Sequence, residues 1–223
     1  MDIENTLILA SKSYSEDIAQ RALINLIPWA GSSMDNIFTS KWSNYQQNRL
    51  EIFQNCVKEQ FQQIDEEKVD FAFIESEEFF DLIISLIEKS VKTRHKEKIE
   101  LFSKLLRCQV DMDFISNYQP EDFTQIINDF TPREILILNA IEKLNKDFQI
   151  EKEKSNVPVE IYINVVKLKN YVHFSDDEIN FSLSKLSKLG LLNEYYPNQF
   201  GMISGGEYQV TDTYQEILKI IEH

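Results

Sequence analysis

The stretch from Ser76 to Val110 constrains the fold more than any other part of the chain. Its apolar residues recur at spacings of three and four, which is the period of a helix with one buried face. The first run comprises Phe79, Leu82, Ile83, Leu86, Ile87 and Val91, and the second comprises Ile99, Phe102, Leu105 and Leu106. The pattern predicts two consecutive amphipathic helices, the first capped by Ser76 and the second by Thr93.

Composition favours a mainly α-helical protein. The chain has only five Gly and five Pro, while Leu, Ile, Glu, Lys and Gln, which suit helices, are abundant. A hydrophobic content of 43% is enough for a buried core. We predict an N-terminal helical domain over residues 1–130 and a second domain over residues 131–223.

The N-terminal region reads as a series of helices. A short apolar cluster within residues 2–14 indicates a first helix, and a second ends at Pro28 before a turn. A long helix is expected over residues 34–64, and a homodimer through it is one option beside packing within the chain. Ala22–Phe38 is the least polar stretch, which leaves open either a membrane-interacting hairpin or a helix corner packed inward.

The C-terminal region carries three capping boxes, each with Ser or Thr three residues before Glu. They begin at Thr131, Ser175 and Thr213. Another helix is expected to begin at Pro158, with Tyr162, Val165, Val166 and Lys169 along one side, and Gly190 is the expected end of the Ser175 helix. Two strands, over residues 191–196 and 207–211, are predicted to flank a loop.

This order, with LSKLSKLGLLNEYY followed by GGEYQVT, resembles the third helix and wing of the winged helix-turn-helix superfamily over Thr131–His223. The resemblance implies a winged-helix-like domain with a two-stranded β wing. In a DNA-binding member, the third helix would enter the major groove. The candidate nucleic-acid contacts are then Asn180, Ser184, Lys185, Ser187 and Lys188.

The run ALINLIPWAGSSMDNIF, the long helix after it, and EKSVKTRHKEKIELFSKLL resemble helical bacterial proteins of the Abi-alpha type. Some of these proteins are associated with abortive infection and phage resistance. The resemblance covers about Ile18–Leu144. It implies a bacterial origin and a role in phage defence, and it carries over no functional residue.

Charge argues against a nucleic-acid reader. The net charge is −14, both halves are acidic, and the wing contains no Arg or Lys. Because phosphate neutralisation dominates affinity for DNA, a winged helix that packs on protein is the favoured interpretation. No signal peptide or membrane-spanning run is present, so we expect a cytoplasmic protein whose cysteines, Cys56 and Cys108, are buried free thiols.

No catalytic, cofactor-binding or metal-binding motif is recognisable. The three histidines are far apart in the sequence, there is no C-x-x-C pair, and no phosphate-binding glycine pattern occurs. We therefore predict a non-enzymatic interaction or regulatory protein with a protein partner and no cofactor. Two alternatives stay open: a transcription regulator that binds DNA as a dimer, and a membrane-acting defence effector that uses Ala22–Phe38.

Overall fold

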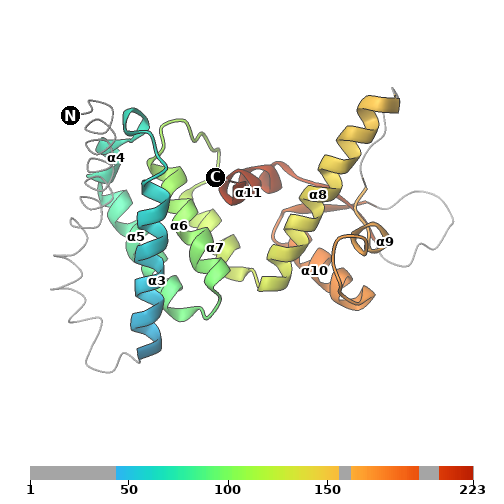
Figure 1. Cartoon of the computed structure of the whole chain (residues 1–223), viewed down its shortest axis with the longest axis horizontal. Helices are drawn as coiled ribbons and strands as arrows, with labels where there is room; N and C mark the ends of the chain where they lie inside the picture. The colour runs from blue at the N-terminus through green and yellow to red at the C-terminus, as the bar shows by residue number, and fades with distance from the viewer. Residues whose placement is uncertain (1–43, 156–161, 196–205, 223) are drawn as a thin grey trace, which may run out of the picture. The chain divides into compact units, whose positions relative to one another are not determined.

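The computed structural model describes residues 44–155, 162–195 and 206–222 (Figure 1). The protein is mainly helical, with a small two-stranded antiparallel sheet near the C-terminus, as the sequence predicts. The chain separates into two compact units: unit 1 comprises residues 1–129 and 220–223, and unit 2 comprises residues 130–219. The helices expected before residue 44, and with them the stretch 22–38, lie outside the described residues.

Unit 1 is built around helix α6, which packs against the helices before and after it (Figure 1). Its described elements are α3 (Asn44–Phe61), the 3-10 turn η1 (Glu66–Lys68), α4 (Phe71–Ile74), α5 (Glu77–Lys92), α6 (Lys96–Val110) and α7 (Pro120–Asp129). Leu86 of α5 and Phe102 and Leu105 of α6 are completely buried. The two amphipathic helices predicted from Ser76 to Val110 are thus confirmed as the centre of the unit's core.

The cap of α6 differs from the sequence prediction. Thr93 ends α5 and lies in extended backbone, and the residue that precedes α6 is His95, whose side chain makes no capping hydrogen bond. The Thr93 hydroxyl instead accepts a hydrogen bond from the His95 backbone N–H. The prediction of a Thr93 cap is therefore wrong by two residues, because Thr93 orders the turn between the two helices. Ser76 caps α5 as predicted, accepting from the Phe79 N–H at 3.1 Å.

Basic side chains of unit 1 satisfy backbone carbonyls at the ends of helices. The last carbonyls of a helix have no partner within it, and Lys or Arg can supply one. Three such contacts run from Arg49 to the Val91 carbonyl at 3.0 Å, from Lys98 to the Asn128 carbonyl at 2.7 Å, and from Lys104 to the Ile221 carbonyl. These three basic side chains therefore join separate helices of unit 1.

Unit 2 contains a long helix followed by shorter elements. They are α8 (Pro132–Ser155), α9 (Val165–Leu168), α10 (Asp176–Lys188), β1 (Leu192–Tyr195), β2 (Glu207–Val210) and α11 (Asp212–Glu222), whose residues from 220 onward belong to unit 1. The strands are antiparallel, with Leu192 opposite Val210. Tyr208 also exchanges two backbone hydrogen bonds with Ile163 on the other edge of β2.

The helix expected from Pro158 through Lys169 is formed only from Val165 to Leu168 in its described part. Tyr162 is not helical, Ile163 forms a β-bridge, and Asn164 is extended and caps the short helix α9. β-branched residues favour extended backbone, and pairing with β2 gives Ile163 the partners that a helix would otherwise supply. The residues from 156 to 161 lie outside the described part.

The predicted start and end of α10 are confirmed, and the predicted start of α11 is wrong. Ser175 and Glu178 form a complete capping box at the start of α10, and Gly190 follows the helix with a φ of +76°. The third box does not begin at Thr213. The Thr211 hydroxyl accepts from the Tyr214 N–H at 3.1 Å and donates to the Gly190 carbonyl at 2.7 Å. Thr211 therefore caps α11.

Candidate functional site

The candidate site is the junction of α8 and α10 in unit 2, because α10 carries all five of the residues predicted to contact nucleic acid. Of these, Ser184 and Lys188 are exposed, whereas Asn180, Lys185 and Ser187 are half-buried. The five therefore do not form one solvent-facing surface. What they can contact depends on the side chains of α8 and α9.

Lys185 lies against α8. Its ammonium group donates to the Glu134 carboxylate at 2.8 Å, and the Lys185 side chain is 27% exposed while that of Glu134 is 1% exposed. A lysine with its charge bound to a buried carboxylate is not free to neutralise a phosphate group. This pairing removes one of the two lysines on which the nucleic-acid hypothesis rests.

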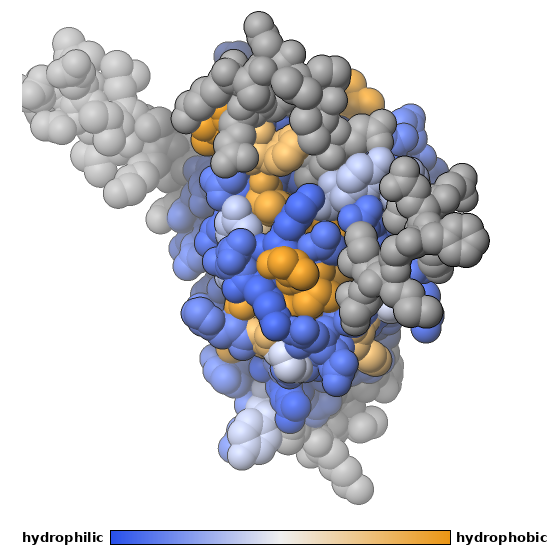
Figure 2. Space-filling view, turned by 90° about the vertical axis from the view of Figure 1, so that its right-hand side faces the viewer, coloured by the Kyte–Doolittle hydropathy of each residue, from blue (hydrophilic) through white to orange (hydrophobic). Residues whose placement is uncertain are grey.

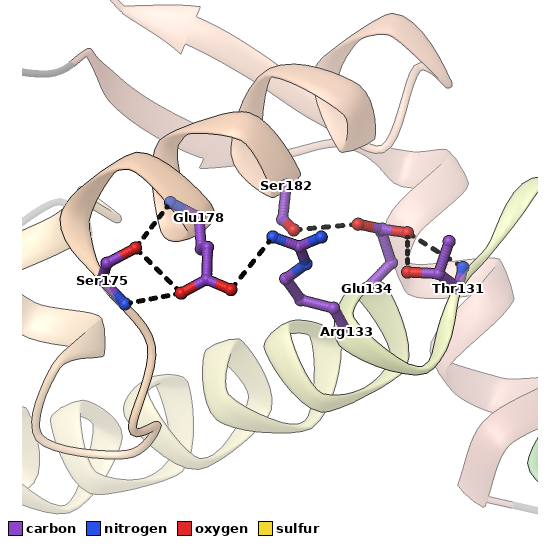
Figure 3. Close-up of polar contacts among 6 residues, drawn as sticks. All are labelled: Thr131, Arg133, Glu134, Ser175, Glu178 and Ser182. Atoms are coloured by element: carbon purple, nitrogen blue, oxygen red, sulfur yellow. Dashed lines mark hydrogen bonds and ion pairs between the residues drawn. The ribbon is translucent and has the colours of Figure 1, made fainter.

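Three further donors surround the same carboxylate (Figure 3). The Ser182 hydroxyl donates to Glu134 Oε1 at 2.8 Å, and the Thr131 N–H and hydroxyl donate to Oε2 at 2.9 and 2.6 Å. We call Thr131, Glu134, Ser182 and Lys185 the Glu134 network. It joins the first turn of α8 to the middle of α10 through a carboxylate whose two oxygens are both satisfied, as burial of a charge requires.

The Glu134 network keeps its carboxylate ionised. Burial acts to raise the pKa of Glu134, but the hydrogen bonds from Lys185, Thr131 and Ser182 outweigh it and leave the pKa below its ordinary value. Such a group holds its proton too weakly to act as a general acid near neutral pH. The chemistry of the network is therefore that of a fixed ionic link between helices.

A second link joins the same two helices nearer the start of α10 (Figure 3). Arg133 lies 3.5 Å from a carboxylate oxygen of Glu178, and its guanidinium also lies 5.8 Å from the ring centroid of Phe181. Hydrogen bonds from Ser175 lower the pKa of Glu178, which closes the capping box. Arg133 thus bridges a carboxylate and an aromatic ring.

The solvent-facing side of α10 is a line of four exposed residues spaced by four, three and four positions, namely Asp177, Phe181, Ser184 and Lys188. We call it the α10 line. It has one acid, one base and one aromatic ring, and Phe181 is 62% exposed. Phe181 was not among the residues predicted from the sequence, although the buried stripe of Ile179, Leu183 and Leu186 places position 181 on the opposite side of a helix.

The other lysines near α10 are also engaged. Lys169 pairs with Asp176, and Lys167 donates to the Tyr162 carbonyl at 2.6 Å. Within the described part of α9 and α10, Lys188 is the lysine that has no ion pair or hydrogen bond to a described residue. The positive charge offered by these two helices is therefore small.

The described part of the chain has neither a candidate metal site nor a candidate membrane-spanning helix. No group of three or more His, Cys, Asp or Glu residues is arranged there to hold a metal ion. Among the helices of the same residues, none combines the length and the apolar character needed to cross a bilayer.

A family model described as abortive infection alpha matches residues 45–223. The chain belongs to the abortive infection alpha family. The sequence resemblance over residues 18–144 thus identified the right family, and the match confirms it over residues 45–144. The match does not include ALINLIPWAGSSMDNIF, and it extends through all of unit 2. No curated protein and no solved structure gives a significant match. In this member of the abortive infection alpha family, the Glu134 network and the α10 line both lie in the matched region.

Proposed function

We propose that this protein is a non-enzymatic interaction protein with a role in abortive infection, and that unit 2 binds a protein partner. Membership of the abortive infection alpha family supports the biological role. The observation that carries the mode of action is the α10 line, which offers an exposed aromatic ring between groups of opposite charge.

The α10 line suits protein better than nucleic acid. Neutralisation of phosphate charge by Lys and Arg supplies much of the affinity for DNA, yet the line supplies only Lys188 and places Asp177 one turn before Phe181. Aromatic residues and Arg are enriched at the centres of protein interfaces. Arg133 beside the Phe181 ring provides that combination. The face drawn in Figure 2 likewise combines a small apolar patch with hydrophilic side chains around it.

The order of elements in unit 2 supports a winged-helix-like architecture for this interaction module. Unit 2 begins with the long helix α8, followed by Ile163, which forms a β-bridge, and by the helices α9 and α10. The antiparallel strands β1 and β2 and the closing helix α11 come next. In that arrangement α10 occupies the position of the recognition helix. Binding of protein in place of DNA follows from its residues, since function resides in the site and not in the fold.

A photo-crosslinking experiment tests the proposal. A photoreactive phenylalanine analogue at position 181 of the full chain, expressed in its native host during phage infection, is expected to crosslink to one protein species. The same analogue at Tyr45, which is 75% exposed in unit 1, is the matched control. Phe181→Asp is expected to abolish both the crosslinked partner's co-purification and any reduction in plaque number, while Tyr45→Asp leaves both unchanged.

A DNA-binding assay separates the alternative. Fluorescence anisotropy of a random-sequence duplex at low salt is expected to show no salt-dependent binding by the full chain. Tight binding that weakens steeply with salt and is lost in Lys188→Ala would overturn the protein-partner proposal in favour of a DNA-binding dimer.

A further inference from the structure

Unit 2 contains a groove of about 550 Å³ between the second half of α8, the end of β2 and the start of α11. We call it the α8–α11 groove. Its volume lies within the range of small-ligand and peptide side-chain pockets. The described residues that line it all belong to unit 2, and none of them is part of the Glu134 network or the α10 line.

Four aliphatic side chains line the groove. They are Ile150, which is 52% exposed, Ile163, Val210 and Leu218. A large aliphatic side chain open to solvent in this way offers apolar area that a ligand can remove from water. The groove is therefore suited to an apolar group that enters from the surface.

Three neutral amide side chains also line the groove. Asn145 and Gln149 are four residues apart on one face of α8, and Gln215 faces the groove from α11. Each carboxamide offers one acceptor oxygen and two N–H donors. This is the complement of a peptide group, which has one N–H and one carbonyl.

The described residues that line the groove carry no net charge. The charged ones among them, Glu142 and Lys146, pair with each other at 3.0 Å. This disfavours a phosphate or a metal ion as the ligand. Among the described lining residues there is also no aromatic ring, the platform on which proteins commonly stack a base. An uncharged ligand with an aliphatic group and amide edges fits these residues best.

We propose that the α8–α11 groove binds an extended, uncharged peptide segment of the protein partner. An aliphatic side chain of the peptide packs against Ile163, Val210 and Leu218, and the peptide groups on either side bond to the carboxamides of the groove. The proposal rests on the function proposed above, because it takes the partner to be a protein, and it adds a second contact surface to the α10 line.

The direct probe is N-acetyl-leucine N′-methylamide, a leucine side chain flanked by two amide groups. Titration into the isotopically labelled full chain is expected to shift the methyl signals of Ile150, Ile163 and Leu218 in a saturable way, with a Kd on the order of 1 mM. Adenosine and inorganic phosphate are titrated in parallel. Saturable binding of either at the groove, or no saturable shift with the leucine probe, overturns the proposal.

A matched pair of variants locates the probe. Asn145→Asp places a carboxylate within the groove at nearly unchanged volume, and we expect it to weaken binding by about tenfold or more because a charge would lose water there. Asn139→Asp makes the same change on the exposed part of α8 outside the groove, and binding is expected to stay the same. Equal weakening by both variants would contradict the groove as the site.

Failure of this proposal is distinguishable from failure of the proposed function. Phe181→Asp is expected to leave the probe titration unchanged, because Phe181 does not line the groove. Loss of probe binding with the position-181 crosslink intact would reject the groove alone. Probe binding without any crosslink at position 181 would reject the α10 line as the partner surface and leave the groove standing.

Discussion

The ammonium group of Lys185 donates to the buried carboxylate of Glu134 across 2.8 Å and so ties the middle of α10 to the first turn of α8. This one contact decides two properties of unit 2. It helps to fix how the two helices pack, and it withdraws a lysine from the surface that a DNA-binding winged helix would use. Lys185 of α10, one of the residues predicted to bind nucleic acid, therefore helps to hold α10 against α8.

Replacing Glu134 by Gln is expected to destabilise unit 2 by about 1–3 kcal/mol, because Lys185 loses its charged acceptor in a largely buried position. Hydrogen exchange of the α8 and α10 amides in the full chain measures this free energy. Glu88→Gln is the control, since Glu88 pairs with Lys92 on an exposed surface of unit 1. Its effect is expected to stay below about 0.5 kcal/mol. Equal effects of the two variants would contradict the structural role of the network.

The stability of unit 2 is expected to depend on acid pH through Glu134. Its folded-state pKa is lowered, so its contribution is complete above the ordinary glutamate pKa of about 4.3 and is lost as the pH falls through the lower, folded value. The difference in amide exchange free energy between the wild type and Glu134→Gln should therefore be constant above about pH 5 and shrink below about pH 4. A difference that grows on acidification would show the opposite sign of shift.

The Glu134 network was only half predictable from the sequence. The pattern from Thr131 to Glu134 indicates a capping box, and Glu134 does accept from the Thr131 N–H. The contacts to Ser182 and Lys185, however, span 48 and 51 residues. Local spacing reports contacts within one helix, whereas these depend on how two helices pack, which a single sequence does not encode in any short pattern.

Thr211→Ala is expected to destabilise the start of α11 by about 1 kcal/mol, the usual cost of losing a cap, because the Thr211 hydroxyl satisfies the Tyr214 N–H. Thr213→Ala is the control, since Thr213 lies inside the first turn and a smaller cost is expected there. Amide exchange at Tyr214 measures both. A larger loss of stability in Thr213→Ala than in Thr211→Ala would mean that Thr213 caps the helix, as the sequence pattern favours.

Gly190→Ala is expected to cost about 1 kcal/mol, because position 190 has a φ of +76° and side chains with a Cβ are strained in that region. An added Cβ would meet no atom within 4 Å, so crowding contributes nothing. Gly190→Asn is the matched control, since Asn tolerates the left-handed conformation better than Ala. Thermal unfolding of the three proteins should rank glycine above asparagine and asparagine above alanine.

Sequence periodicity predicted the elements of this fold better than their junctions. The helices after Ser76 and Ser175 follow from long amphipathic runs, and the two strands follow from apolar runs beside glycine. Errors occur where a short segment has a distant partner. Ile163 is extended because Tyr208 supplies its backbone hydrogen bonds. Thr211 is the cap at a point where the chain has returned to Gly190, whose carbonyl accepts from the Thr211 hydroxyl.

The thiol of Cys108 is expected to be unreactive in the folded protein. It is completely buried, and burial raises its pKa to about 12. Because the thiolate is the reactive form, alkylation by iodoacetamide at pH 8 should be roughly 10³-fold slower than for an ordinary cysteine, before any steric protection. Cys56, also buried and with a pKa raised chiefly by burial, is expected to be slow as well.

Mass spectrometry of the intact chain before and after unfolding in guanidinium checks the alkylation of both cysteines. Both sites should become modified only in the unfolded protein, because unfolding restores water to each thiolate. Cys56→Ser leaves Cys108 as the single reporter, so that any native-state labelling can be assigned without digestion. Rapid modification of Cys108 under native conditions would mean that α6 opens readily, which its place at the centre of unit 1 argues against.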